Sequence, residues 1–121
     1  TLADEMKYFK RIEILKKLIA LGCKTVILSG ISYEPNKTGI VVYSKGDYQY
    51  YEHDLLPNSC HGTGDIYASA FVGALMRGKS SYDAARIAAD YTVSCIRATD
   101  AGHWYGARFE PVLGELIEML K

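Results

Sequence analysis

Residues 24–30 constrain the fold of this chain more than any other stretch. They read Lys-Thr-Val-Ile-Leu-Ser-Gly, a short β-branched run closed by glycine, and its continuously apolar core fits a strand buried on both faces, as in a parallel sheet. Apolar residues at steps of three and four predict a helix from Asp4 to Leu21, which Gly22 ends just before this run. A helix that leads into a buried strand predicts an α/β fold.

The rest of the chain supplies too few strands to complete such a sheet. Two β-rich runs, Gly39–Ser44 and Asp47–Glu52, flank Lys45-Gly46 and predict a hairpin. Three further helices are predicted, at 65–76, 80–97 and 110–121. Because one parallel-type strand and a hairpin cannot make a sheet buried on both faces, we expect the 121 residues to be part of a larger domain.

The composition narrows the classes of function. The 14 basic and 14 acidic side chains cancel and no Lys/Arg cluster stands out, so we expect no nucleic-acid partner. No apolar run approaches the ~20 residues of a membrane-spanning helix, so we expect no membrane segment. The three cysteines lack CxxC spacing, which indicates reduced thiols and a cytoplasmic location. His53 and His103 have no partners at ligand spacing, so no metal site is predicted in the chain.

One segment matches a nucleotide-binding motif letter for letter. Residues 73–80 read Gly-Ala-Leu-Met-Arg-Gly-Lys-Ser and fit the P-loop pattern G-x-x-x-x-G-K-[ST]. A P-loop needs a flexible turn whose amides surround phosphate, whereas the Ala-Leu-Met at 74–76 favours a helix. We therefore expect a helix that ends at Gly78 and a second helix capped by Ser80.

A second candidate phosphate site lies at Gly62-Thr63-Gly64, directly before Asp65 and a predicted helix. Backbone amides at a helix start bind anions, and the glycines let a phosphate approach the backbone. A carboxylate beside such a site fits a base that accepts a proton from an attacking hydroxyl. Aspartate is also a common residue at helix starts, so the four residues alone leave a plain helix cap equally open.

At this point the sequence resembles the ribokinase-like (PfkB) carbohydrate and vitamin kinases. Residues 59–65, Ser-Cys-His-Gly-Thr-Gly-Asp, are similar to that family's signature D-T-x-G-A-G-D, with departures at the first, second and fifth letters. The G-T-G-D variant resembles the pyridoxal kinase branch. The alanine-rich stretch 84–93 and the segment 104–110 are also similar to these kinases, so the resemblance covers nearly the whole chain but only the C-terminal half of such an enzyme.

The resemblance implies the C-terminal part of a three-layer α/β/α sandwich that phosphorylates a pyridoxal-type hydroxymethyl group with ATP and Mg²⁺. It implies Asp65 as the catalytic base and Gly62, Thr63 and Gly64 as the anion hole. It further implies a homodimer in the complete enzyme. The positions that it places near the nucleotide are Ser29, Gly30, Leu56, Pro57, Cys60 and Ile96 or Arg97.

Two other functions remain open. The segment His61–Gly64 also resembles the hydroxymethylpyrimidine kinases of thiamine synthesis, although those typically carry Cys where this chain has Asp65. The chain could also be a non-catalytic nucleotide-binding fragment. The family's Asn-x-x-Glu magnesium motif is not matched by residues 34–36 and is expected upstream, so we expect these 121 residues alone to bind nucleotide weakly without turnover.

Overall fold

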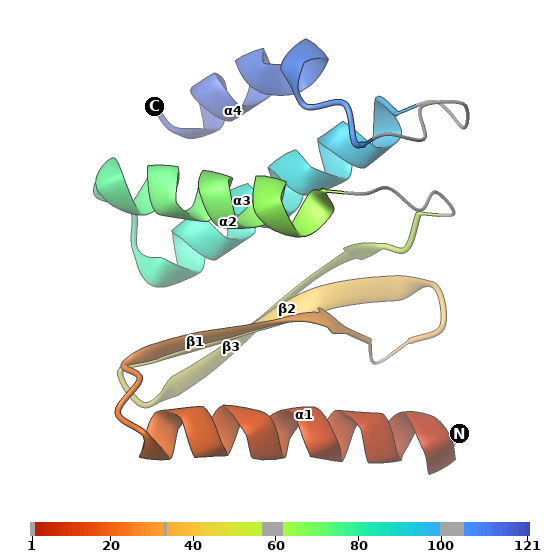
Figure 1. The fold of residues 1–121 in the computed structure, drawn as a ribbon, viewed down its shortest axis with the longest axis vertical. Coiled ribbons are helices and arrows are strands. Elements are labelled where there is room, and N and C mark those ends of the chain that lie inside the picture. The colour runs from red at the N-terminus through yellow and green to blue at the C-terminus, as the bar shows by residue number, and fades with distance from the viewer. Residues whose placement is uncertain (1, 33, 57–61, 100–105) are drawn as a thin grey trace. The chain divides into compact units, whose positions relative to one another are not determined.

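The computed structural model describes residues 2–32, 34–56, 62–99 and 106–121. The chain consists of two compact units, Thr1–Leu55 and Leu56–Lys121. The elements, in chain order, are α1 (Leu2–Ala20), β1 (Thr25–Ile31), β2 (Lys37–Ser44), β3 (Asp47–Asp54), α2 (Thr63–Met76), α3 (Ser81–Arg97), the short 3₁₀-helix η1 (Glu110–Val112) and α4 (Leu113–Met119) (Figure 1).

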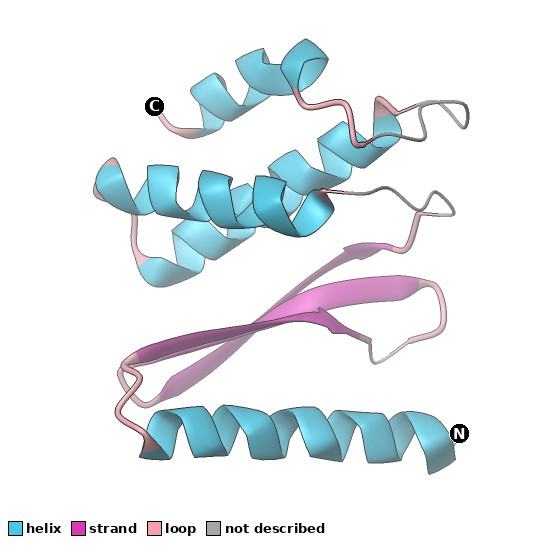
Figure 2. Ribbon diagram, viewed as in Figure 1, coloured by secondary structure: helices cyan, strands magenta, loops and turns pink. Residues whose placement is uncertain are grey.

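The first unit is a three-stranded antiparallel sheet, in the order β1-β2-β3, with α1 along one face (Figure 2). Leu15 of α1 is fully buried in a core that it shares with Val26 and Val41 of the sheet. The hairpin turn consists of Lys45 and Gly46, both at positive φ, which is the backbone geometry that a tight two-residue turn requires. The predicted helix and the predicted hairpin are confirmed.

The structure corrects the environment expected for residues 24–30. β1 spans Thr25–Ile31 and pairs only with β2, in antiparallel orientation, so within the described residues it is an edge strand. Val26 and Ile31 are buried, but Ser29 and Gly30 are exposed. Continuous apolar character identified the strand correctly but could not specify its neighbours, because the pairing partner of a strand is set by the sheet and not by the strand's own residues.

The second unit is built on the antiparallel pair α2 and α3. Small residues let the two helices approach closely: Ala74 packs with Ala84 and Ile87, and Ala70 packs with Ala88. The polypeptide between the helices is short, and the side chain of Ser80 caps α3 by accepting a hydrogen bond from the amide of Asp83 (3.1 Å). The predicted helix end and the predicted cap are confirmed.

Two hydrogen bonds fasten the segment after α3 to that helix. The hydroxyl of Tyr91 donates to the carbonyl of Phe109 (2.8 Å), and the buried hydroxyl of Thr99 accepts from the amide of Arg108 (2.8 Å). The single helix predicted for 110–121 is instead η1 followed by α4, and Ile117, expected on its apolar face, is 53% exposed. Pro111 in the first turn favours the tighter 3₁₀ start.

Candidate functional site

The start of α2 presents backbone amides that the helix itself does not use. Gly62 precedes the helix in the left-handed conformation, with φ 85° and ψ 3°, and provides no side-chain cap. The first helical hydrogen bond runs from the amide of Ile66 to the carbonyl of Gly62 (3.0 Å). The amides of Thr63, Gly64 and Asp65 precede it and have no partner among the described residues, so they can donate to an anion.

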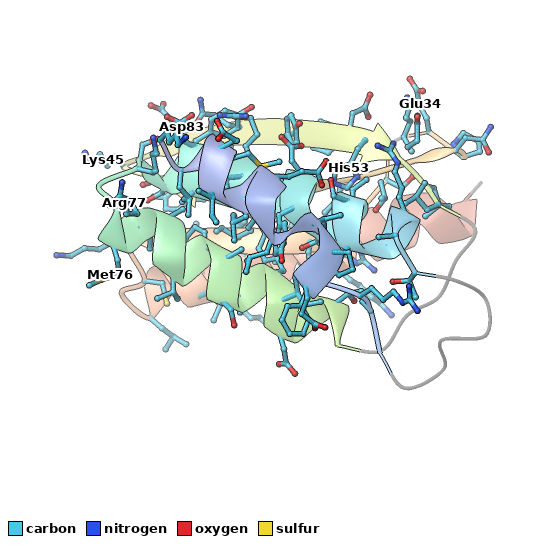
Figure 3. The ribbon with its side chains drawn as sticks, turned by 90° about the horizontal axis from the view of Figure 1, so that it is seen from above. Glu34, Lys45, His53, Met76, Arg77 and Asp83 are labelled. Carbon is cyan, nitrogen blue, oxygen red and sulfur yellow. The ribbon has the colours of Figure 1, made fainter. Side chains whose placement is uncertain are left out.

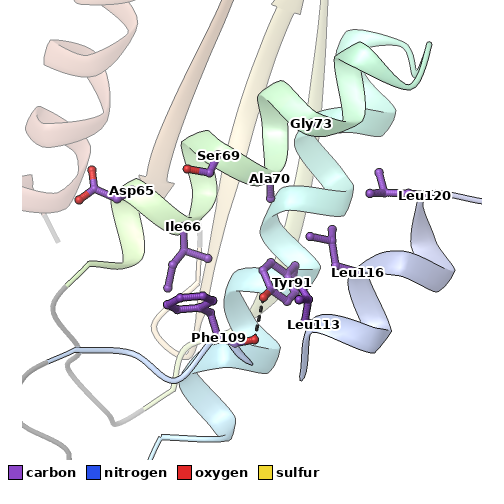
Figure 4. A pocket seen from close by; sticks show the side chains of 10 residues that line it. All are labelled: Asp65, Ile66, Ser69, Ala70, Gly73, Tyr91, Phe109, Leu113, Leu116 and Leu120. Atoms are coloured by element: carbon purple, nitrogen blue, oxygen red, sulfur yellow. Dashed lines mark hydrogen bonds between the residues drawn. The ribbon is translucent and has the colours of Figure 1, made fainter. Parts of the chain in front are cut away.

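Asp65 is the third residue of α2 and its side chain is exposed. Figure 4 shows its carboxylate pointing away from Ile66 and Phe109, toward the outside of the helix pair. Among the described residues it makes no hydrogen bond and no ion pair. The carboxylate is therefore accessible to a ligand held on the amides of the same turn.

The P-loop match at residues 73–80 does not form a phosphate-binding loop. Its first four residues are the last turn of α2, and Gly78 follows at φ 84°. The amides of Arg77, Gly78 and Lys79 all donate to carbonyl oxygens of that turn, so none of them is available to phosphate. The ammonium of Lys79 donates to the carbonyl of Lys121 (3.1 Å). Figure 3 shows Met76, Arg77 and Asp83 together at this junction of the two helices.

Some of the predicted site residues lie at one end of the helix pair α2 and α3. Gly62, Thr63, Gly64 and Asp65 form the first turn of α2, and Ile96, half-buried, lies in the last turn of the antiparallel α3, at the same end of the pair (Figure 1).

The other predicted positions lie elsewhere in the chain. Ser29 and Gly30 are adjacent at the end of β1 in the first unit. Leu56 is half-buried at the start of the second unit. Pro57 and Cys60 fall outside the described residues.

A mostly apolar cavity of about 360 Å³ borders the site, and the sequence analysis did not identify it. It lies between α2, α3 and α4 (Figure 4). Its wall includes Ile66, Tyr91, Phe109 and Leu116, and Asp65 stands at its margin. The apolar residues at 110–121 did not define the length and start of α4, which forms part of the wall, so no sequence pattern indicated the cavity.

Two tyrosines of the second unit stay protonated at neutral pH. Burial raises the pKa of Tyr67 to about 12, and its hydroxyl donates to the carbonyl of Ala85 (3.1 Å). Burial, assisted by the nearby Cys95, raises the pKa of Tyr91 to about 12. Both side chains therefore act as neutral hydrogen-bond donors, and the electrostatics at the start of α2 depend on the helix amides and on Asp65.

Over the described ranges, no group of three or more His, Cys, Asp or Glu side chains is placed to hold a metal ion. Among the helices of the same residues, none combines the length and the apolar character needed to cross a membrane.

The chain has the fold of the ribokinase-like α/β kinases. A protein assigned as a phosphomethylpyrimidine kinase from Bacteroides thetaiotaomicron is 30% identical with a TM-score of 0.77 over 87% of this chain and 38% of its own length. Its orthorhombic crystal form, which contains pyridoxal, is 31% identical over 87% of this chain and 39% of its own, with a TM-score of 0.76. Pyridoxal kinase from Lactobacillus plantarum shares the fold at 19% identity and a TM-score of 0.69, over 78% of this chain and 36% of its own length.

The sequence model of the phosphomethylpyrimidine kinase family matches residues 4–109, and the chain belongs to this family. The expected fold class, that of the ribokinase-like α/β kinases, is confirmed. The chain spans less than two-fifths of the length of the solved structures that it matches. No curated protein sequence matches the chain significantly.

Proposed function

We propose that residues 1–121 form the C-terminal part of a kinase domain that phosphorylates the 5′-hydroxymethyl group of pyridoxal, pyridoxamine or pyridoxine with ATP. The start of α2 carries this proposal, because an exposed carboxylate, Asp65, stands beside amides that have no partner among the described residues. The pyridoxal in crystals of the Bacteroides protein supports the choice of substrate class.

In the proposed reaction, each group at the start of α2 has one task. Asp65 accepts the proton of the hydroxymethyl group, whose oxygen forms a bond to the γ-phosphorus of ATP while the bond from that phosphorus to the bridging oxygen of ADP breaks. The amides of Thr63 and Gly64 donate to the oxygens of the phosphoryl group in transfer, and Gly62 provides the turn that leaves them unused by the helix. Fixed amides suit this chemistry, because phosphoryl transfer depends on positioning and on charge stabilisation.

The nucleotide positions in this proposal are assigned from the family resemblance. Ser29 and Gly30 lie near the triphosphate in this assignment, and Leu56, Pro57, Cys60 and Ile96 lie near the adenine. Mg²⁺ accompanies ATP and neutralises part of its charge. The described residues contain no group of three or more His, Cys, Asp or Glu side chains placed to hold an ion, and the proposal assigns none of them to Mg²⁺. The homodimer and the cytoplasmic location complete the proposal and depend on the family resemblance.

The alternative substrate is hydroxymethylpyrimidine or its phosphate, as in thiamine synthesis. The description of the matching family and the assignment of the Bacteroides protein favour it. Asp65 favours the pyridoxal branch, because the pyrimidine kinases typically carry cysteine there. Pyridoxal and hydroxymethylpyrimidine both present a hydroxymethyl group, so the chemistry at Asp65 is the same for these two acceptors. Hydroxymethylpyrimidine phosphate would instead accept the phosphoryl group on a phosphate oxygen, which carries no hydroxyl proton for Asp65 to remove.

A substrate panel tests the proposal. The natural polypeptide that carries this chain is incubated with ATP, Mg²⁺ and either pyridoxal, pyridoxine or hydroxymethylpyrimidine, and ADP release is measured. We expect the B6 vitamers to be phosphorylated with the highest kcat/KM. Preference for the pyrimidine establishes the alternative, and binding of ATP analogues without turnover of any alcohol establishes a non-catalytic nucleotide-binding protein.

A further inference from the structure

The end of β1 contains a bulge that removes Gly30 from the sheet. β1 pairs with β2 through Ser29 and again at Ile31, and the register shifts between these two residues. Gly30 adopts φ 71°, in the left-handed region that favours glycine. Bulges often lie beside functional sites, because they redirect a side chain or a backbone group out of the ladder. Here the redirected group is the carbonyl of Gly30.

That carbonyl accepts a hydrogen bond from Nη1 of Arg11 on α1. The antiparallel course of α1 and β1 explains the pairing. A helix rises about 1.5 Å and a strand about 3.3 Å per residue, so Arg11 and Gly30 both lie roughly 15 Å from the turn that joins their elements. A Cβ atom at Gly30 would lie 3.5 Å from Nη1, so the guanidinium is seated directly against the bulge.

Most of the hydrogen-bonding capacity of Arg11 is left over. A guanidinium carries five N–H groups, and the contact with Gly30 uses Nη1 alone. Among the described residues, no carboxylate is paired with Arg11. The side chain is half-buried, while Ser29 and Gly30 beside it are exposed. A guanidinium held in this way matches the geometry of phosphate, to which it donates two parallel hydrogen bonds.

The turn that we assign to the phosphoryl group brings no cation of its own. Residues 62–65 are Gly-Thr-Gly-Asp, whose one ionisable side chain is a carboxylate. Lys79, the lysine of the P-loop match, follows the opposite end of α2 and donates to the carbonyl of Lys121. A polyphosphate nevertheless needs positive charge around it. Within the first unit, Arg11 places positive charge beside Ser29 and Gly30, the segment that the proposed function assigns to the triphosphate.

We propose that Arg11 binds a phosphate group of the nucleotide at the bulged end of β1, with the carbonyl of Gly30 holding its guanidinium in place. This inference rests on the proposed function, because that function assigns Ser29 and Gly30 to the triphosphate. It adds a residue that no sequence motif marks, since Arg11 lies in the middle of an ordinary amphipathic helix.

Comparing ADP with adenosine tests the inference, because the two ligands differ only in the diphosphate. Dissociation constants are measured by calorimetry for the natural polypeptide that carries this chain, for Arg11→Gln and for Lys10→Gln. The lysine is the matched control, since it is exposed, adjacent and loses the same charge. We expect Arg11→Gln to weaken ADP binding at least about tenfold and to leave adenosine unchanged, because a charged hydrogen bond to phosphate is lost. We expect Lys10→Gln to change neither constant.

The remaining outcomes each decide the matter. If Arg11→Gln weakens ADP and adenosine equally, the arginine only supports the bulge and the inference is wrong. If ADP binding is unchanged, the inference is wrong while the proposed function stands, and if the unmodified protein binds neither ligand, both fail. Arg11→Lys covers the case in which Arg11→Gln does not fold. Arg11→Lys keeps the charge but not the planar guanidinium, so we expect its ADP affinity to lie between those of the unmodified protein and Arg11→Gln. An ADP affinity equal to that of the unmodified protein rejects the phosphate contact.

Discussion

Each end of α2 has a glycine in the left-handed conformation next to it, but the two ends differ in their capacity to bind an anion. Gly62 before the helix and Gly78 after it adopt φ values of 85° and 84°. At the start, the amides of Thr63 and Gly64 have no partner among the described residues, whereas at the end the amides of Gly78 and Lys79 bond back to the helix. The helix dipole reinforces the contrast, since its start attracts anions and its end repels them.

This difference indicates that a glycine-rich motif can bind phosphate only where its amides are unused. The better letter match, residues 73–80, falls at the helix end, and the weaker one, Gly62–Asp65, falls at the start. The helix-forming residues 74–76 already argue against the P-loop match, and the direction of the helix supplies the reason. A left-handed glycine closes hydrogen bonds at the end of a helix, whereas at its start the amide donors stay open.

The largest expected effect comes from Asp65, the carboxylate at the start of α2. Because Asp65→Asn removes a proton acceptor while keeping the shape of the side chain, we expect kcat to fall by about 10²- to 10⁴-fold. We expect the affinity for ADP to change little, since the amides of the turn remain. Steady-state kinetics with pyridoxal and calorimetry with ADP measure the two quantities.

Asp83→Asn is the matched control for this variant. Asp83 occupies the same third position of α3 that Asp65 occupies in α2, and it too is partly exposed. We expect Asp83→Asn to leave kcat unchanged. Equal losses of kcat in the two variants would mean that Asp65 acts only through the stability of its helix.

The two glycines give the second comparison. Among the described residues, no atom lies within 4 Å of a Cβ built at Gly62 or at Gly78, and both glycines have positive φ, so we expect alanine at either site to cost backbone strain. We expect each variant to lose about 1–2 kcal/mol of unfolding free energy, measured by urea denaturation. We expect ADP affinity to fall only in Gly62→Ala, because its strained turn displaces the open amides. A loss of ADP affinity in Gly78→Ala as well would contradict the assignment of phosphate to one end of α2.

Much of the fold was predictable because the relevant signals are local. The period of apolar residues defined α1, the Lys45-Gly46 pair defined the hairpin, and Ser80 defined the start of α3. The neighbours of β1 were not predictable, since pairing depends on strands that its own residues do not encode. The last helix was predicted too long, because the apolar pattern at 110–121 carries no information on the 3₁₀ turn that Pro111 begins.

The candidate site divides in the same way. Gly62–Asp65 could be found from the sequence, because glycines before a helix and an adjacent acid form a contiguous pattern. Arg11 could not, since its contact with Gly30 joins residues 19 positions apart through a bulge that no residue type specifies. Contacts of this kind follow from how α1 packs on the sheet, so they become visible only in three dimensions.

Removing the cap of α3 is expected to have a smaller effect, which is confined to the free energy of unfolding. Ser80→Ala removes the hydroxyl that accepts from the amide of Asp83, and the loss of such a cap costs about 1 kcal/mol. We expect urea denaturation to record this loss while calorimetry records an unchanged affinity for ADP. If Ser80 were instead the serine of a P-loop, Ser80→Ala would lower the affinity for ADP.

The smallest expected effect is the most discriminating, and it concerns Lys79. In a P-loop this lysine contacts the terminal phosphates, and Lys79→Ala would abolish nucleotide binding. In the structure its ammonium donates to the carbonyl of Lys121 at the surface, a contact of little energetic weight. We therefore expect Lys79→Ala to keep its ADP affinity and to change the unfolding free energy by less than about 0.5 kcal/mol. Loss of ADP binding in Lys79→Ala, with Asp65→Asn still binding ADP, would move the nucleotide site from the start of α2 to its end.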